Sequence, residues 1–186
     1  MSKAIVFMAD GMEMCECLIT VDILRRAGVD VTTASVMGRM SIESSHKVMI
    51  HADALAEDVD FASADMLVLP GGTVGTANLA SKEIVKEQCM AFAGNSNKYL
   101  AAICAAPAIL ADLGLLEGRR ATCHPGVEED MAGAVLSHAY VAVDHNIITG
   151  KAMAATTEFA LKLAELLQGR EAAERVAMGI CFEQGL

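Results

Sequence analysis

A cysteine stands where an apolar run must turn into a helix in the stretch YLAAICAAPAIL, residues 99–110. Ala102 and Ala106 are small enough for a tight, strained turn around Cys104, and Pro107 suits the first turn of a helix. A strand-to-helix turn of this kind can lift a nucleophile out of a sheet. N–H groups at the helix N-terminus would stabilise a thiolate and lower the pKa of the thiol. A buried, inert cysteine is the alternative, and the local sequence favours neither.

Two glycines close a second apolar run, DMLVLPGG, at residues 65–72. Because glycine has no Cβ, the backbone of Gly71 and Gly72 can approach a ligand closely. Their N–H groups, together with that of Ala105, could form an oxyanion hole beside Cys104. Taken alone, Pro-Gly-Gly is more typical of a plain turn.

Glu16 has apolar neighbours, since it lies between Cys15 and Cys17 and is followed by Leu18 one residue later. Burial in such surroundings raises the pKa of a carboxyl group, so we expect Glu16 to be protonated much of the time. A protonated carboxyl could shuttle a proton or donate a hydrogen bond to a thiolate. An ordinary solvent-facing glutamate is the alternative interpretation.

His124 is the best placed of the five histidines, because Pro125 ends its strand and leaves the ring on a rim. The sequence has no Ser-His-Asp arrangement, dinucleotide-binding fingerprint or Walker loop. Cys15 and Cys17 form a C-x-C pair without further ligands at zinc spacing, so we expect neither a metal site nor a cofactor. The other histidines lie in polar or hairpin segments and are expected at the surface: His46, His51, His138 and His145.

The elements that must position these residues are strands alternating with helices. Such alternation implies parallel crossovers and therefore an α/β fold, a doubly wound, mostly parallel sheet with helices on both faces. We expect one domain over residues 1–186, with its site outside the carboxyl ends of the strands. Strands are expected in residues 3–10, 29–35, 65–72 and 99–103, a loop in 73–80, a hairpin or an excursion in 36–50, a hairpin in 139–149, and helices in 13–27, 81–93, 107–114 and, as the last clear element, 153–167.

One helix face can be predicted in more detail. Met14, Leu18, Val21 and Leu24 recur at helical spacing within residues 13–27, so we expect these four side chains to face the core.

The composition limits the classes of function. The chain has 186 residues, of which 54% are hydrophobic and only 4% aromatic, and its net charge is −10. This charge, without any Lys/Arg cluster larger than a pair, disfavours nucleic-acid binding. No segment approaches the ~20 apolar residues of a membrane span, and the first apolar run is too short for a signal peptide. Six cysteines in this context indicate reduced thiols, so we expect a cytoplasmic protein that binds no membrane.

Five motifs in a fixed order make the sequence similar to a known family. They are MEMCECL with Glu16, VDILRRAGVDVT with Asp22 and Arg26, VLPGGTVGTANL, AAICAAPAIL and TCHPG. Together they span most of the chain and resemble the ThiJ/PfpI superfamily, in the branch typified by the Parkinson-disease protein deglycase. The resemblance implies a flavodoxin-like fold and a homodimer.

The resemblance also implies roles at the matched positions. Members with protease or chaperone-like activity carry His directly after the nucleophile, where this chain has Ala105. Glutamine amidotransferases carry an acid two residues beyond their late His, where this chain has Gly126. Both branches are therefore disfavoured. The implied site consists of Cys104, Glu16 and His124 with the backbone of Gly72 and Ala105, and Arg26 and Lys151 are weaker candidates for substrate contacts.

The chain departs from the family pattern at three positions. Lys151 and Met153 stand in the segment GKAMAAT, where the family typically has Ser-Arg-Gly-Pro-Gly-Thr. Lysine keeps the positive charge but lacks the bidentate geometry of arginine. Met14 replaces a second acid that the family often has, which makes the surroundings of Glu16 more apolar.

The resemblance implies a cofactor-independent enzyme that converts 2-oxoaldehydes such as methylglyoxal and glyoxal, or their early adducts on proteins, to 2-hydroxy acids. Cys104 would be the nucleophile and Glu16 the proton shuttle, with His124 assisting. A redox sensor or chaperone that acts through oxidation of Cys104 is the main alternative, since the same reactive thiol predicts both. A relative that has lost activity, through the changes at Lys151 and Met153, is a third.

Overall fold

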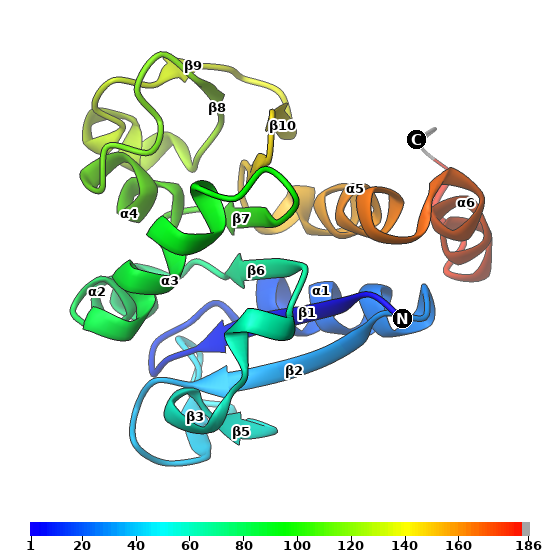
Figure 1. The fold of residues 1–186 in the computed structure, drawn as a ribbon, viewed down its shortest axis with the longest axis horizontal. Coiled ribbons are helices and arrows are strands. Elements are labelled where there is room, and N and C mark those ends of the chain that lie inside the picture. Colours follow the sequence, from blue (N-terminus) through cyan, green and yellow to red (C-terminus); the bar gives the residue numbers. More distant parts are fainter. Residues whose placement is uncertain (184–186) are drawn as a thin grey trace.

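A seven-stranded sheet forms the centre of the structure, a computed structural model that describes residues 1–183. The strand order is β10-β11-β7-β6-β1-β2-β5, and every neighbouring pair is parallel except β10 with β11. This arrangement confirms the predicted doubly wound α/β fold (Figure 1). The strands are β1 Lys3–Met8, β2 Asp30–Ser35, β5 Ala54–Leu55, β6 Met66–Leu69, β7 Tyr99–Ile103, β10 Val141–Asp144 and β11 Ile147–Gly150.

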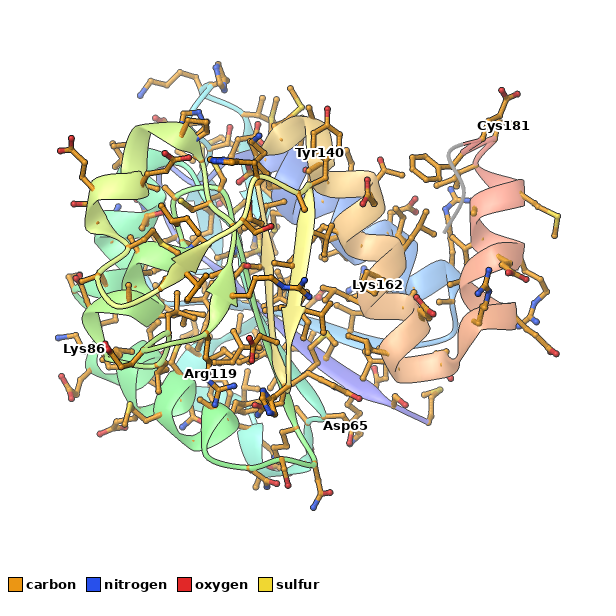
Figure 2. All side chains as sticks on the ribbon, turned by 90° about the horizontal axis from the view of Figure 1, so that it is seen from above. Asp65, Lys86, Arg119, Tyr140, Lys162 and Cys181 are labelled. Carbon is orange, nitrogen blue, oxygen red and sulfur yellow. The ribbon has the colours of Figure 1, made fainter. Side chains whose placement is uncertain are left out.

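Helices cover both faces of this sheet, with Lys86 of α3 and Lys162 of α5 on opposite sides (Figure 2). Successive residues of β1 alternate between the two faces, so that Val6 packs in the core under α1 and α5, whereas Phe7 packs in the core under α3 and α4. The helices are α1 Met14–Arg26, α5 Thr156–Gln168 and α6 Arg170–Gly179 on one face, and α2 Thr73–Ala80, α3 Glu83–Ala93 and α4 Pro107–Asp112 on the other.

Two small sheets and four short 3₁₀ helices complete the described elements. Both predicted hairpins are confirmed, since β3 pairs antiparallel with β4 and β10 pairs antiparallel with β11. The remaining elements are β3 Ser41–Glu43, β4 Met49–His51, β8 Arg120–Ala121, β9 Val135–Leu136, and the 3₁₀ helices Ala56–Asp58, Phe61–Ser63, Pro125–Asp130 and Met153–Ala155. Within residues 1–183, every helix is too short or too polar to cross a bilayer.

The strand order reverses beside β1, which brings three turns to one edge of the sheet. From β1 the chain moves outward through β2, and it then returns to the other side of β1 with β6 and β7. The carboxyl ends of β1, β6 and β7 therefore lie side by side, at the place where doubly wound sheets hold their sites. The turns that follow these strands carry Gly11, Gly71 and Cys104.

The prediction of a loop at residues 73–80 was wrong, because this segment forms α2. Its Thr, Val and Gly residues have low helix propensity and show no apolar stripe. Tertiary contacts hold it instead: the Asn78 side chain donates to the Asp10 carbonyl at 2.8 Å, and the Gly75 N–H donates to the Gly11 carbonyl at 3.1 Å.

The expected end of the fold was also wrong. The last long helix, α5, begins at Thr156, after a 3₁₀ turn that contains Met153, and a further helix, α6, follows a break at Gly169. The buried face of α6 is made mainly of alanines, which give a weak hydrophobic signal in a segment rich in charge.

The predicted buried face of α1 was wrong in one respect. Val21 and Leu24 are buried as expected and Met14 is half-buried, but Leu18 is 41% exposed. Glu16 and Thr20 lie on the buried face instead. The helix is therefore rotated so that its first buried residue is an acid, which places Glu16 under the turns described above.

Candidate active site

Cys104 occupies a strained turn between β7 and α4. Its φ angle is +66°, a left-handed conformation that is uncommon for a residue with a side chain. Two backbone hydrogen bonds hold it there, since its N–H donates to the Gly150 carbonyl at 2.9 Å and its carbonyl accepts the His124 N–H at 2.8 Å. Such strain persists where the surroundings determine it, and it is concentrated at functional sites. The turn leaves the Cys104 side chain half-buried.

Two backbone donors and one carboxyl group surround the Cys104 sulfur. The N–H groups of Gly72, after β6, and of Ala105, in the turn itself, interact with the sulfur and act to lower the pKa of the thiol. The carboxyl group of Glu16, from α1, is the third group that interacts with it. Three separate segments of the chain therefore form the site: α1 contributes Glu16, the turn after β6 contributes the Gly72 N–H, and the turn after β7 contributes Cys104 and the Ala105 N–H.

Glu16 is buried, with only 1% of its surface exposed. One carboxyl oxygen, Oε2, accepts the Gly71 N–H at 2.9 Å, whereas Oε1 has no hydrogen-bond partner within residues 1–183. Burial raises the pKa of Glu16 to about 7, although the interactions with the Cys104 thiol and the Gly71 N–H oppose this rise. A large fraction of Glu16 is thus protonated near neutral pH, and Oε1 is the oxygen that is free to carry the proton.

The pKa prediction for Cys104 was wrong in direction. Burial, followed by the negative charge of Glu16, raises the pKa of the thiol to about 12, and the N–H groups of Gly72 and Ala105 offset this rise only in part. Helix α4 has six residues, so its dipole is small. The effect of Glu16 depends on its ionisation, because a neutral carboxyl group can donate to the sulfur. The two groups therefore titrate as a pair that shares one proton.

The two glycines after β6 have different partners. The Gly71 N–H donates to Glu16, so the structure does not direct it into the predicted oxyanion hole. A Cβ at Gly71 would lie 2.6 Å from the Cys104 Cβ and 2.7 Å from Glu16 Oε2, and no side chain fits there. Gly72 and Ala105 remain as the two donors that face the sulfur.

His124 is tied to Cys104 through its backbone. Its ring is exposed, and Nδ1 accepts the Gly126 N–H at 3.0 Å. A neutral His124 ring therefore carries its proton on Nε2, the nitrogen that this contact leaves free. The other four histidines are exposed, as predicted.

The two candidate substrate contacts, Arg26 and Lys151, have other partners in the structure. Arg26 ends α1 ten residues after Glu16, a rise of about 15 Å along the helix. Its guanidinium group pairs with Asp22 at 2.7 Å. Lys151 directly follows Gly150 in the chain, but its ammonium group donates to the His138 carbonyl at 3.3 Å.

Sequence reasoning did not single out Glu13, which caps the helix that carries Glu16. Its carboxylate caps the N-terminus of α1 by accepting the Glu16 N–H at 2.7 Å. An acid three residues before the functional acid, at the start of a helical pattern, is a signal that could have indicated it. In the described part of the chain, no cluster of three or more His, Cys, Asp or Glu residues could hold a metal ion.

Comparison with known proteins identifies relatives along nearly the whole chain. The sequence model of the DJ-1/PfpI family matches residues 2–166. The Parkinson disease protein 7 homolog of Danio rerio is 38% identical over 178 residues, which cover 94% of each chain. The glutathione-independent glyoxalase DJR-1.2 of Caenorhabditis elegans is 29% identical over 183 residues, covering 97% of this chain and 96% of the relative.

Solved structures of relatives have the same fold. Oxidized DJ-1 of Toxoplasma gondii superposes with a TM-score of 0.94 at 30% identity, covering 98% of this chain and 100% of the other. DJ-1beta of Drosophila melanogaster superposes with a TM-score of 0.91 at 34% identity, covering 97% of each chain.

Proposed function

The chain belongs to the DJ-1/PfpI family, and from this premise we propose that it is a glutathione-independent enzyme that converts 2-oxoaldehydes, or their early adducts on proteins, to 2-hydroxy acids. The observation that carries the proposal is the pairing of Cys104 with a buried carboxyl group that has a pKa of about 7, beside two backbone donors. The relative from Caenorhabditis elegans that is named a glutathione-independent glyoxalase supports the same class of reaction.

The reaction begins with proton transfer within the pair. Ionised Glu16 takes the thiol proton of Cys104, and the resulting thiolate attacks the aldehyde carbon of methylglyoxal. The carbonyl oxygen becomes an oxyanion, which the N–H groups of Gly72 and Ala105 stabilise. Glu16 returns its proton to this oxygen, and the product is a hemithioacetal.

Glu16 then moves a proton between the two adjacent carbons. Its carboxylate removes the proton from the former aldehyde carbon while the neighbouring ketone oxygen takes up a proton, which gives an enediol. Glu16 then delivers the carbon-bound proton to the neighbouring carbon, and the hydroxyl group on the sulfur-bearing carbon loses its proton to become the thioester carbonyl. The product is a thioester of a 2-hydroxy acid on Cys104. Water attacks the thioester, lactate leaves, and the thiol is restored; His124, with a free Nε2, assists proton transfer at this step. The sequence of steps requires no cofactor.

A second candidate function is redox sensing through Cys104. The half-buried sulfur and its neighbours favour it, because two N–H donors and a protonated carboxyl could hold the oxygens of a cysteine sulfinate. The relative from Toxoplasma gondii was solved in an oxidized form. On either function we propose a homodimer, and the six free thiols favour a reducing, cytoplasmic location.

Turnover distinguishes the two functions. Purified protein, free of glutathione, is expected to convert methylglyoxal to lactate, and Cys104→Ser is expected to lower the rate by at least about 1000-fold, because the nucleophile is lost. Cys181→Ser is the matched control and should keep the full rate, since this exposed thiol lies beyond α6 on the outer side of the molecule (Figure 2). No turnover, together with ready formation of a Cys104 sulfinate, would favour the redox sensor.

A further inference from the structure

Three hydrogen bonds close a ring that includes one residue without an assigned role. The N–H of Glu13 donates to the Gly71 carbonyl at 2.9 Å. The N–H of Gly71 donates to Oε2 of Glu16 at 2.9 Å, and the N–H of Glu16 donates to Oε2 of Glu13 at 2.7 Å. The carboxylate of Glu13 therefore binds the backbone of Glu16, and the side chain of Glu16 binds the turn at Gly71.

We propose that Glu13 is a positioning residue of the active site, whose carboxylate holds the start of α1, and with it the Glu16 carboxyl group, against the Gly71–Gly72 turn that faces Cys104. This inference rests on the proposed function in one respect: the groups that Glu13 would position, the Glu16 carboxyl and the Gly72 N–H, are groups that act in the proposed reaction.

The ring connects to the sulfur on both sides. On one side, Glu16 interacts with Cys104, and on the other, Gly72 follows Gly71 and its N–H interacts with the sulfur. The packing at this point leaves little freedom, since a Cβ at Gly72 would lie 2.6 Å from the Glu13 nitrogen. A displacement of Glu13 would therefore move the proton shuttle and one oxyanion donor together.

Glu13 also acts on Glu16 through its charge. No Lys or Arg within residues 1–183 forms an ion pair with Glu13, so its negative charge is not neutralised by a neighbour. This charge raises the pKa of Glu16, in addition to the larger effect of burial. The other groups that interact with the Glu16 carboxyl are the Gly71 N–H and the thiols of Cys104, Cys15 and Cys17. Burial, followed by the charges of Glu13 and Glu16, raises the pKa values of Cys15 and Cys17. A neutral helix cap would stabilise α1 without influencing the titration of the pair through its charge.

Two substitutions separate the hydrogen bond from the charge. Glu13→Gln keeps an oxygen that can accept the Glu16 N–H, whereas Glu13→Ala removes it, and both remove the negative charge. The readout is the rate of Cys104 alkylation by iodoacetamide between pH 5 and pH 10, with the adduct located by mass spectrometry and the labelling of Cys104→Ser subtracted. This rate does not depend on turnover, and methylglyoxal turnover is measured in parallel.

Both variants are expected to shift the lower limb of the alkylation profile to lower pH, by on the order of half a pH unit, because Glu16 loses a negative neighbour. Glu13→Ala should also lower kcat by about 10-fold or more with little change in KM, because Glu16 is no longer held in place. Glu13→Gln should restore kcat to within about 3-fold of the original protein. Glu43→Gln is the matched control, since Glu43 pairs with Lys47 at the surface and should leave the profile unchanged.

An unshifted profile in both variants, or equal kcat in Glu13→Ala and Glu13→Gln, would overturn the inference. Circular dichroism of each variant shows whether it is folded, and Glu13→Gln provides the test if Glu13→Ala fails to fold. If the original protein shows no turnover of methylglyoxal while the alkylation profiles shift as expected, the proposed function fails and the role of Glu13 stands.

Discussion

Glu16 shows at the level of one residue how a site is maintained at the expense of stability. A carboxyl group with 1% exposure and one unpaired oxygen is costly to bury in its charged form. An apolar residue of similar size would pack on this face of α1 without that cost. The benefit is chemical, because a carboxyl group with a pKa of about 7 can both donate and accept a proton at neutral pH.

The cost of Glu16 predicts a pH dependence of stability. The pKa of Glu16 is raised from 4.5 to about 7 on folding, so the folded protein binds one more proton than the unfolded chain between these values. The free energy of unfolding should therefore contain a contribution from Glu16 that is fully present below pH 4.5 and is lost as the pH rises through 7, by about 3 kcal/mol in total.

Urea denaturation from pH 4.5 to 8 checks this contribution. The free energy of unfolding of the original protein, minus that of Glu16→Gln, should decline up to about pH 7 and then remain constant. Glu57→Gln, a substitution at an exposed acid, controls for the loss of one charge. A difference that rises with pH, or that does not change, would contradict the burial of an ionisable group at this position.

At the level of elements, the junction between β6 and α2 brings two backbone segments unusually close. Gly72 caps α2 with a φ of +93°, and a Cβ there would lie 2.5 Å from the Gly11 carbonyl oxygen and 2.6 Å from the Glu13 nitrogen. These neighbours are backbone atoms, so they cannot move aside as a flexible side chain could. Glycine is therefore required both by conformation and by space.

Gly72→Ala is expected to lower the free energy of unfolding by about 2–4 kcal/mol, because strain and overpacking add. Gly28→Ala is the matched control, since Gly28 has a φ of +84° but no atom within 4 Å of the added Cβ. In Gly28→Ala, backbone strain alone should lower the free energy of unfolding by about 1 kcal/mol. Chemical denaturation of both variants measures the difference, and equal costs would show that the close approach to residues 11–13 does not constrain the fold.

At the level of the whole molecule, one helix layer presents apolar surface to solvent. Leu18 of α1 lines a groove of about 360 Å³ together with Ile19, Ile23 and Phe182. The groove lies between α1, α5 and the end of α6, on the face opposite α2, α3 and α4. Burial of such a surface would stabilise the proposed homodimer.

The homodimer can be tested by sedimentation velocity. We expect the original protein to sediment as a dimer and Leu18→Glu to sediment as a monomer, because a charge would be buried in the interface. Met90→Glu is the control, since Met90 is exposed on α3, in the opposite helix layer. A monomeric original protein, or dissociation by Met90→Glu alone, would contradict an interface that includes Leu18.

The sequence by itself determined the types of the main elements and the turns that matter. Alternating apolar runs and helical spacing predict the parallel sheet, and glycine, proline and small residues mark the turns at Gly71 and Cys104, because these signals depend only on neighbours in the chain. They do not reveal α2, whose residues have low helix propensity and which Asn78 and Gly75 hold against the loop after β1.

Only the tertiary structure decided how the site works. In the folded chain, Glu16 is buried and Leu18 is exposed. The Gly71 N–H donates to the carboxyl group of Glu16, 55 residues away, and Arg26 lies at the far end of α1. The tertiary structure also raised the pKa of Cys104, where the local sequence predicted a lower value. Burial and hydrogen bonding depend on which distant segments of the chain are in contact, and the order of the strands in the sheet determines these contacts.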